Sequence, residues 1–183
     1  MTEPTRLGTL SAGPALDRTD LLASPVADAL AGDPRADRVT VAPINPELAD
    51  TTAFCAAYRV PPAASANCVV VSGKRAGEQR WAAAVILATT RADVNGAIRR
   101  RLDVRKLSFA PMADAVSRTG MEYGGITPIG LPADWPVLID AAVVAAGPVV
   151  IGSGIRGSKI ILDAALLAEL TGAEVIEGLA VRV

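Results

Sequence analysis

The chain has 183 residues, of which 51% are apolar and only 3% are aromatic, and its formal net charge at pH 7 is −1. This length and composition predict one domain with a sizeable core built from small side chains. The near-zero charge excludes an overall basic field for nucleic acid, and the absence of histidine excludes a histidine base and histidine metal ligands.

Residues 1–38 are predicted to form an N-terminal arm and a helix, followed by a domain over residues 39–183. Residues 1–19 are rich in Pro, Gly, Thr and Ser, a composition typical of a loose arm, and the helix is predicted over residues 20–30. The arm has no apolar stretch like that of a secretory signal, and the chain has no apolar run long enough to span a bilayer. We therefore expect a cytoplasmic protein that does not enter a membrane.

The next elements are a short strand over residues 39–44 and one helix over residues 45–58. Asn45 is suited to cap this helix, and Pro46 has the fixed φ that suits the first helical position. Two strands rich in Val, Ile and Ala, at 66–72 and 81–89, are joined by a turn and predict a hairpin.

The second half of the chain alternates short strands and helices. Asp93 is predicted to cap a helix that carries arginines on its outer face. The later elements are a strand at 106–109, a helix at 111–118, strands at 137–140 and 149–151 around a helical turn, a strand at 160–162, a helix at 164–170 and a strand at 174–179. This irregular order predicts an α/β (α+β) fold with a mixed sheet flanked by helices rather than a regular doubly wound sheet.

Two glycine-rich segments stand out, GGITPIG at 124–130 and GSGIRG at 152–157. Glycine allows positive φ and lets another molecule approach the backbone closely, so both segments are candidate ligand-binding loops. The second segment is also a literal GxGxxG, the dinucleotide-binding pattern. That pattern requires a helix directly after it, whereas SKIIL predicts a strand. The interpretation of this chain as a dinucleotide-dependent oxidoreductase therefore rests on the glycine spacing alone.

Other candidate residues have structural as well as functional interpretations. Asp140 lies in an apolar run, where a carboxylate either caps backbone amides or faces a site. Cys55 and Cys68 lack CxxC spacing, so we expect no structural metal site, and Cys68 in a strand is typical of a small core residue. No cofactor is expected. The arginines and lysine between Arg99 and Lys106 form either a solvated helix face or a local contact with nucleic acid.

The order SFAPM, TG, GGITPIG, ID, GSGIRG and LLAELTGAEV resembles the YbaK/EbsC family, which includes free-standing relatives of the prolyl-tRNA synthetase editing domain. The resemblance covers roughly residues 39–183. It implies a YbaK-like α/β fold with a central mixed, barrel-like sheet, and hydrolysis of the ester of a misacylated tRNA. It also implies that the terminal adenosine and its amino acid lie beside the GxxxPxG loop. The partners implied are a misacylated tRNA and an aminoacyl-tRNA synthetase.

The resemblance assigns site residues in this chain. Those expected to act on the ester are Asn67, Gly124, Pro128, Gly130 and Lys159. Those expected to contact the substrate are Gly125, Ile126, Thr127, Asp140, Gly152, Ser153, Gly154 and Arg156.

Two positions depart from the family's pattern. Asn67 occupies a position where typical members have a lysine, and Lys159 occupies one where some members have an acidic residue. Asparagine carries no charge to stabilise an oxyanion, and we hypothesise that Lys159 supplies that charge from the other side of the pocket. The alternative is a non-catalytic protein that binds tRNA or a nucleotide on the same scaffold.

Overall fold

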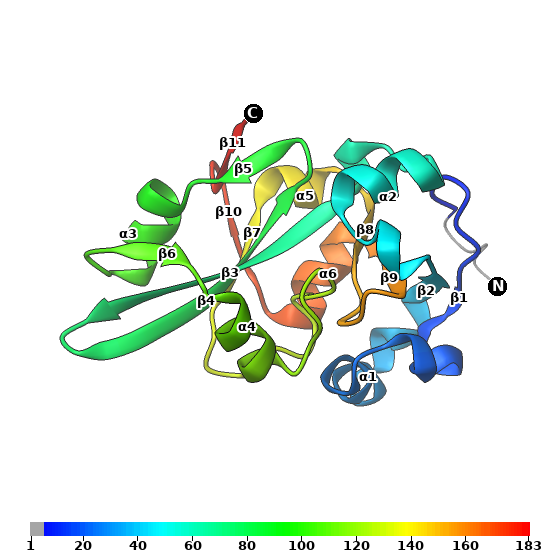
Figure 1. Cartoon of the computed structure of the whole chain (residues 1–183), viewed down its shortest axis with the longest axis horizontal. Coiled ribbons are helices and arrows are strands. Elements are labelled where there is room, and N and C mark those ends of the chain that lie inside the picture. The colour runs from blue at the N-terminus through cyan, green and yellow to red at the C-terminus, as the bar shows by residue number, and fades with distance from the viewer. Residues whose placement is uncertain (1–5) are drawn as a thin grey trace.

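The computed structural model describes residues 6–183, whose strands form a four-stranded, a five-stranded and a two-stranded sheet (Figure 1). The four-stranded sheet is antiparallel and has the order β1 (Gly13–Pro14), β2 (Thr40–Pro43), β9 (Ser158–Asp163), β8 (Pro148–Gly152). The five-stranded sheet has the order β10 (Glu174–Ile176), β7 (Val137–Asp140), β4 (Glu78–Leu87), β3 (Ala66–Arg75), β6 (Leu107–Phe109). The third sheet pairs β5 (Thr90–Ala92) with β11 (Ala180–Arg182).

The five-stranded sheet is mixed, because β7 runs parallel to both β4 and β10 while β3 is antiparallel to β4 and β6. The predicted mixed sheet with flanking helices is therefore confirmed. None of the sheets formed by residues 6–183 closes into a barrel. A parallel bridge between Ser65 and Val150 instead joins the start of β3 to β8.

The α-helices are short. They are α1 (Ser24–Ala31), α2 (Thr51–Tyr58), α3 (Arg99–Leu102), α4 (Met112–Thr119), α5 (Ala141–Ala145) and α6 (Ala164–Thr171). Segments of 3-10 helix lie at Ala15–Leu21, which is kinked at Arg18, and at Pro34–Arg38, Pro46–Leu48 and Pro62–Ala64, and a π turn at Val94–Ile98 leads into α3. Asp93 caps this turn through bonds from Gly96 N and Ala97 N, as its position predicted.

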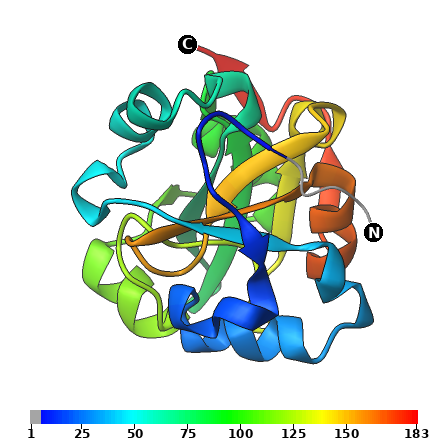
Figure 2. The same ribbon diagram turned by 90° about the vertical axis from the view of Figure 1, so that its right-hand side faces the viewer.

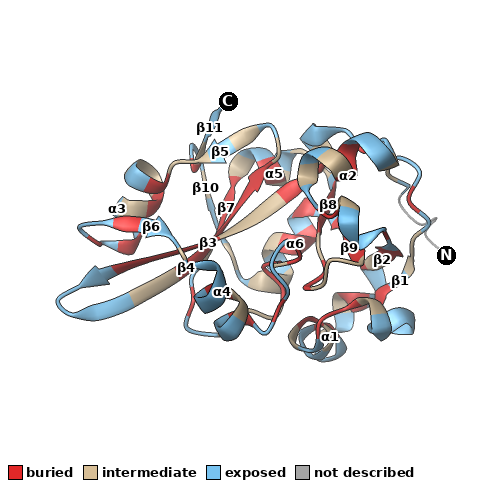
Figure 3. Ribbon diagram, viewed as in Figure 1, coloured by how far each residue is buried: buried red, intermediate tan, exposed pale blue. Residues whose placement is uncertain are grey.

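The largest apolar core lies between the sheets and α1, α5 and α6, and includes the fully buried Val26, Ile139, Ile160 and Leu167. Burial by residue shows the same organisation (Figure 3). The second half of β4 is buried, whereas the far end of the β3–β4 hairpin is exposed and projects from the body of the molecule. The hairpin thus has one end in the core and one end in solvent.

The described part of the N-terminal segment is packed, so the expectation of a loose arm is wrong for residues 6–19. Ala15 is completely buried, and its backbone N–H donates to Val39 O. Figure 2 shows this segment running along the body of the molecule. Residues 1–5 lie outside the described residues, and the domain boundary between 38 and 39 stays a prediction.

The predicted helix over residues 45–58 is in fact two elements. Asn45 accepts a hydrogen bond from Glu47 N, but it caps only the 3-10 turn Pro46–Leu48. Asp50 then caps α2 anew. At the other end of the chain, the predicted strand over 174–179 ends at Ile176, and β11 follows as a separate strand.

Candidate functional site

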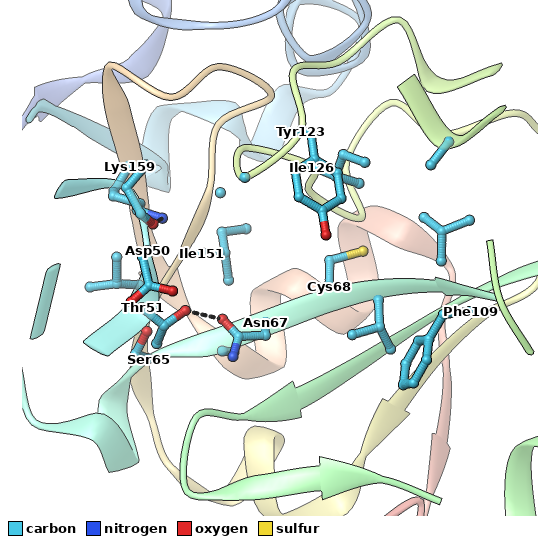
Figure 4. Close-up of a pocket in the computed structure, with 18 of the residues that line it drawn as sticks. Asp50, Thr51, Ser65, Asn67, Cys68, Phe109, Tyr123, Ile126, Ile151 and Lys159 are labelled. Atoms are coloured by element: carbon cyan, nitrogen blue, oxygen red, sulfur yellow. Dashed lines mark hydrogen bonds between the residues drawn. The ribbon is translucent and has the colours of Figure 1, made fainter. Parts of the chain in front are cut away.

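A cavity of about 380 Å³ lies where the start of α2, the first half of β3, the loop before Gly125, and strands β8 and β9 meet (Figure 4). This volume falls within the usual range for small-molecule sites. The lining residues are Ala49, Asp50, Thr51, Ser65, Ala66, Asn67, Cys68, Val69, Val70, Phe109, Ala110, Ala115, Tyr123, Gly124, Ile126, Val150, Ile151, Gly152 and Lys159.

The cavity has a polar side and an aromatic side. Asp50, Thr51, Ser65 and Lys159 lie together on one side in Figure 4. Phe109 and Tyr123 lie on the other side, with exposed fractions of 59% and 54%. Exposed aromatic rings at the mouth of a cavity offer flat apolar faces, whereas the opposite side offers charges and hydrogen-bond donors.

The break before α2 places two polar residues at the cavity. Asp50 Oδ1 accepts hydrogen bonds from the backbone N–H groups of Thr52 and Ala53, at 3.0 and 3.3 Å. An acid is a preferred N-cap because it satisfies amides that have no partner within the helix. Because the helix begins here and not at Pro46, Asp50 and Thr51 line the cavity.

Asn67 lines the cavity next to Thr51. Thr51 Oγ1 donates a hydrogen bond of 2.8 Å to Asn67 Oδ1. Asn67 Nδ2 has no hydrogen-bond acceptor among residues 6–183, so its two N–H groups are available to a ligand.

Lys159 reaches the polar side of the cavity from β9. It is only 8% exposed, and its Nζ donates to Ala49 O at 3.3 Å and lies 5.2 Å from the centre of the Phe54 ring. Burial disfavours the ammonium form and lowers the pKa of Lys159, although the nearby Cys55 and Asp50 oppose this shift. The single long hydrogen bond leaves two ammonium donors for a ligand.

Cys68 lines the cavity as well, and burial raises the pKa of its thiol to about 12. Nearly all of this thiol is protonated at neutral pH, and a protonated thiol is a weak nucleophile. Cys68 therefore contributes a small apolar surface rather than a reactive thiolate.

The two glycine-rich loops pack directly on each other. Gly154 N donates to Gly125 O at 2.7 Å. A Cβ atom at Gly125 would lie 2.6 Å from the backbone of Ile155, and one at Gly152 would lie 2.5 Å from Gly125 O. Glycine is thus required where two backbones approach closely.

Only part of the expected loops reaches the cavity. Gly124, Ile126 and Gly152 line it, together with Asn67 and Lys159. Gly125 and Gly154 are buried in the loop contact instead. Ser153 is also buried, and its hydroxyl bonds to Ser158 Oγ at 2.7 Å.

The second half of the GGITPIG segment lies away from the cavity. The chain turns inward at Thr127, which is completely buried, and Pro128 and Gly130 line a separate hollow of about 220 Å³ beside α1. Gly130 has φ +81°, and a Cβ there would lie 2.4 Å from Pro25 O. The structure therefore does not bring Thr127, Pro128 or Gly130 to the cavity that holds Asn67 and Lys159.

Asp140 and Arg156 also lie outside the cavity lining. Asp140 accepts hydrogen bonds of 2.8 Å from Ala142 N, at the start of α5, and from Ala180 N, which occupies both carboxylate oxygens structurally. Arg156 lies over Gly124 and donates to Tyr123 O at 3.3 Å and Pro46 O at 3.0 Å. Arg156 thereby holds the loop that borders the cavity against the turn before α2.

Several cavity residues were not foreseen from the sequence, namely Asp50, Thr51, Ser65, Phe109 and Tyr123. Asp50 followed by two threonines is a helix-start signal, but Asn45-Pro46 gives a similar signal just upstream. Tyr123 directly precedes the first glycine-rich loop, and this position was the one sequence feature that could have placed it at the cavity.

Residues 6–183 contain no cluster of acids and cysteines that could hold a metal ion. No helix within the described range is long and apolar enough to cross a membrane.

Comparisons with known proteins agree with this fold. The sequence model of the aminoacyl-tRNA editing domain matches residues 45–170. A crystal structure described as a candidate trans-editing enzyme for prolyl-tRNA synthetase aligns with a TM-score of 0.73 at 20% identity, covering 85% of this chain and 94% of that one. The structure of a hypothetical protein aligns with a TM-score of 0.66 at 21% identity, covering 79% and 91%.

Among curated proteins, none matches the sequence. The match of the family's sequence model spans well over half of the chain, and the residues from Asp50 to Lys159 that line the cavity all lie within it. This chain belongs to the aminoacyl-tRNA editing domain family, the YbaK family.

Proposed function

We propose that this protein hydrolyses the ester bond between a wrongly attached amino acid and the 3′-terminal adenosine of a tRNA. The observation that carries the proposal is the convergence of Asn67, Lys159 and the Gly124–Ile126 loop on one cavity inside the editing-family region. An editing site is useful because a synthetase pocket discriminates a missing methylene by only about 1–3 kcal/mol.

The two-sided cavity suggests how the substrate lies. The adenine contacts the exposed rings of Phe109 and Tyr123, since stacking on an aromatic ring contributes about 1–3 kcal/mol per base. The aminoacyl group enters the polar side, between Asn67 and Lys159. Ala49 and Ser65 are small side chains that line the cavity and leave space for the amino acid.

The attacking group in this proposal is water. The chain has no histidine, and the raised pKa of Cys68 removes a thiolate from consideration at neutral pH. The backbone N–H groups of Gly124 and Ile126 donate to no acceptor among residues 6–183. They border the cavity and are suited to orient the water and the ester carbonyl.

Lys159 supplies the positive charge in this mechanism. As water adds to the carbonyl carbon, negative charge develops on the carbonyl oxygen, and the Lys159 ammonium and Asn67 Nδ2 donate hydrogen bonds to it. The tetrahedral intermediate then collapses, the ribose oxygen leaves with a proton, and free amino acid is released. A donor of this kind contributes about 2.7–4 kcal/mol elsewhere.

Basic residues beyond the aromatic side suggest where the rest of the tRNA lies. Lys74, Arg75 and Arg105 line a hollow of about 440 Å³ at the exposed end of the β3–β4 hairpin. Not all of the basic run is available, because Arg101 pairs with Glu174, and Asp103 accepts ion pairs from Arg75 and Arg80. A contact with a synthetase stays a prediction.

The alternative is a protein that binds aminoacyl-tRNA without hydrolysing it. The neutral Asn67 favours this alternative, because its side chain is already held by Thr51 and brings no charge. The two functions differ in turnover alone, since both use the same cavity.

The test is a deacylation assay with tRNAs charged with alanine, cysteine, serine and proline. The wild type, Asn67→Lys and Lys159→Met are compared with the uncatalysed hydrolysis of each ester. Release of one amino acid by the wild type, reduced at least a hundredfold in Lys159→Met, supports the proposed enzyme. Activity in Asn67→Lys alone supports the binding protein, and hydrolysis by none of the three refutes the proposed activity on these esters.

A further inference from the structure

Asp50 is the one acid and Lys159 the one base among the described side chains that line the cavity. Oδ1 of Asp50 is engaged in capping α2, through Thr52 N and Ala53 N. Oδ2 accepts no hydrogen bond and forms no ion pair with any residue from 6 to 183. The mechanism above makes no use of this carboxylate, although it borders the polar side where the aminoacyl group lies (Figure 4).

We propose that Asp50 Oδ2 binds the α-ammonium group of the aminoacyl ester and thereby selects esters whose amino group is free. This inference rests on the proposed function, which places the aminoacyl group in the polar side of the cavity. It assigns Asp50 a role in specificity rather than in the hydrolytic step.

The charges of the cavity complement those of the aminoacyl group. An aminoacyl ester carries a cation on the carbon next to its carbonyl, and the carbonyl oxygen becomes negative as water adds. Asp50 and Lys159 lie on the same side of the cavity and do not pair with each other. A carboxylate and an ammonium placed in this way complement the ammonium and the developing oxyanion of a single substrate group.

Two nearby positive groups weaken the attraction between Asp50 and the substrate ammonium, and neither cancels it. The N-terminus of α2 carries a partial charge of about half a unit, which is smaller than the full charge of the carboxylate. Lys159 is the second group, but it forms no ion pair with Asp50. Asp50 itself is exposed to solvent at the cavity and keeps a carboxylate oxygen free.

A contact between Asp50 and the substrate ammonium would determine which esters the cavity accepts. An ester whose amino group is acylated, such as an N-acetylaminoacyl or peptidyl ester, has no ammonium to meet Asp50. It also brings a carbonyl oxygen toward the carboxylate, which is unfavourable because two acceptors then face each other. The protein should therefore act on aminoacyl esters and spare those of blocked amino acids.

The experiment measures binding of two non-hydrolysable probes by calorimetry. The first is 3′-amino-3′-deoxyadenosine acylated with alanine through an amide, and the second is the same compound with its α-amino group acetylated. The proteins are the wild type, Asp50→Asn and Glu47→Gln. Asparagine caps helices about as well as aspartate, so Asp50→Asn removes the charge and keeps the cap. Glu47 is an exposed acid on the preceding turn that does not line the cavity.

We expect Asp50→Asn to weaken binding of the free-amine probe between about tenfold and a hundredfold. Binding of the acetylated probe should not weaken and should tighten if its carbonyl oxygen faces the carboxylate in the wild type. Glu47→Gln should change neither. Equal loss for both probes, no loss for either, or no binding of the free-amine probe by the wild type would overturn the inference. Since the readout is binding, it stands apart from the deacylation assay, in which loss of turnover overturns the enzyme and leaves this inference intact.

Discussion

Thr51 Oγ1 donates a hydrogen bond of 2.8 Å to Asn67 Oδ1, which ties the first turn of α2 to the start of β3. The bond decides how the Asn67 amide is oriented, because its oxygen faces Thr51 and its N–H groups remain for a ligand. We expect Thr51→Val, which keeps the shape of the side chain and removes its hydroxyl, to lower kcat/KM for hydrolysis of the aminoacyl ester between about twofold and tenfold. In an Asn67→Ala background the same change should have little further effect, and an equal effect there would show that Thr51 acts independently of Asn67.

Lys159→Met should make the protein more stable and less active. Methionine fills the space of the lysine stem without a buried charge, and replacement of buried ionic groups by apolar ones often stabilises by about 1 kcal/mol or more. For a chain of this size that corresponds to roughly 2–4 °C in Tm. A lower Tm in calorimetry would mean that the contacts with Ala49 O and the Phe54 ring outweigh the cost of burial.

The same lysine gives a prediction about pH. Because its pKa is lowered in the folded protein, the unfolded chain binds more protons between that lowered pKa and the ordinary value of 10.5. The free energy of unfolding of the wild type should therefore rise with pH in this window, and the rise should be smaller in Lys159→Met. Urea unfolding at a series of pH values measures how the free energy of unfolding changes with pH in each protein. Identical slopes in the wild type and Lys159→Met would contradict a lowered pKa of Lys159.

Cys68 should resist alkylation although it borders the cavity. With a pKa of about 12, its thiolate is on the order of a thousandfold rarer at pH 8 than that of an ordinary cysteine. Burial also raises the pKa of Cys55. Iodoacetamide should thus modify Cys68 in the native protein on the order of a thousandfold more slowly than Cys68 in the urea-unfolded protein. Rapid labelling of Cys68, detected by mass spectrometry, would contradict this.

Gly125→Ala tests the contact between the two glycine-rich loops. The added methyl group would lie 2.6 Å from the Ile155 backbone, so one loop must move, and we expect a loss of about 1–3 kcal/mol in the free energy of unfolding. Gly13→Ala is the matched control, because a Cβ there meets nothing within 4 Å. Similar losses in both variants would mean that the loop contact does not explain the effect.

Binding of tRNA should depend on salt through the basic hollow at the hairpin end. Lys74→Ala combined with Arg105→Ala should weaken binding and reduce the slope of log K against log salt by about 0.7 for each single-strand phosphate that the variant no longer neutralises. Arg38→Ala, which removes an exposed arginine in the turn before β2, should leave the slope unchanged. A slope equal to that of the wild type in the double variant would remove this surface from the tRNA path.

Local patterns sufficed for much of the fold. The β3–β4 hairpin follows from two runs of apolar residues around Gly77, and the cap at Asp93 follows from its own side chain. The mixed sheet follows from the irregular order of elements. The prediction from local sequence was wrong for the segment from Asn45 to Asp50. Two good helix caps lie five residues apart there, and tertiary contacts decide that both are used.

Part of the site was predictable from the sequence. The family resemblance pointed to Asn67 and Lys159, which both line the cavity. Gly124 and Gly152 are recognisable as glycines in loops, and both border the cavity. That Asp140 is occupied by Ala180 N, or that Lys159 meets Ala49 O, depends on pairings across 40 and 110 residues. No spacing rule within one segment contains such information. Pro128 and Gly130, which the family resemblance assigned to the site, line a different hollow.

The residues that line the cavity come from separate segments of the chain, the first at Ala49 and the last at Lys159. Contacts between residues so distant in sequence form late, because loop closure must precede them. A truncation before β9 would therefore remove Lys159, the one basic side chain among the described residues that line the cavity.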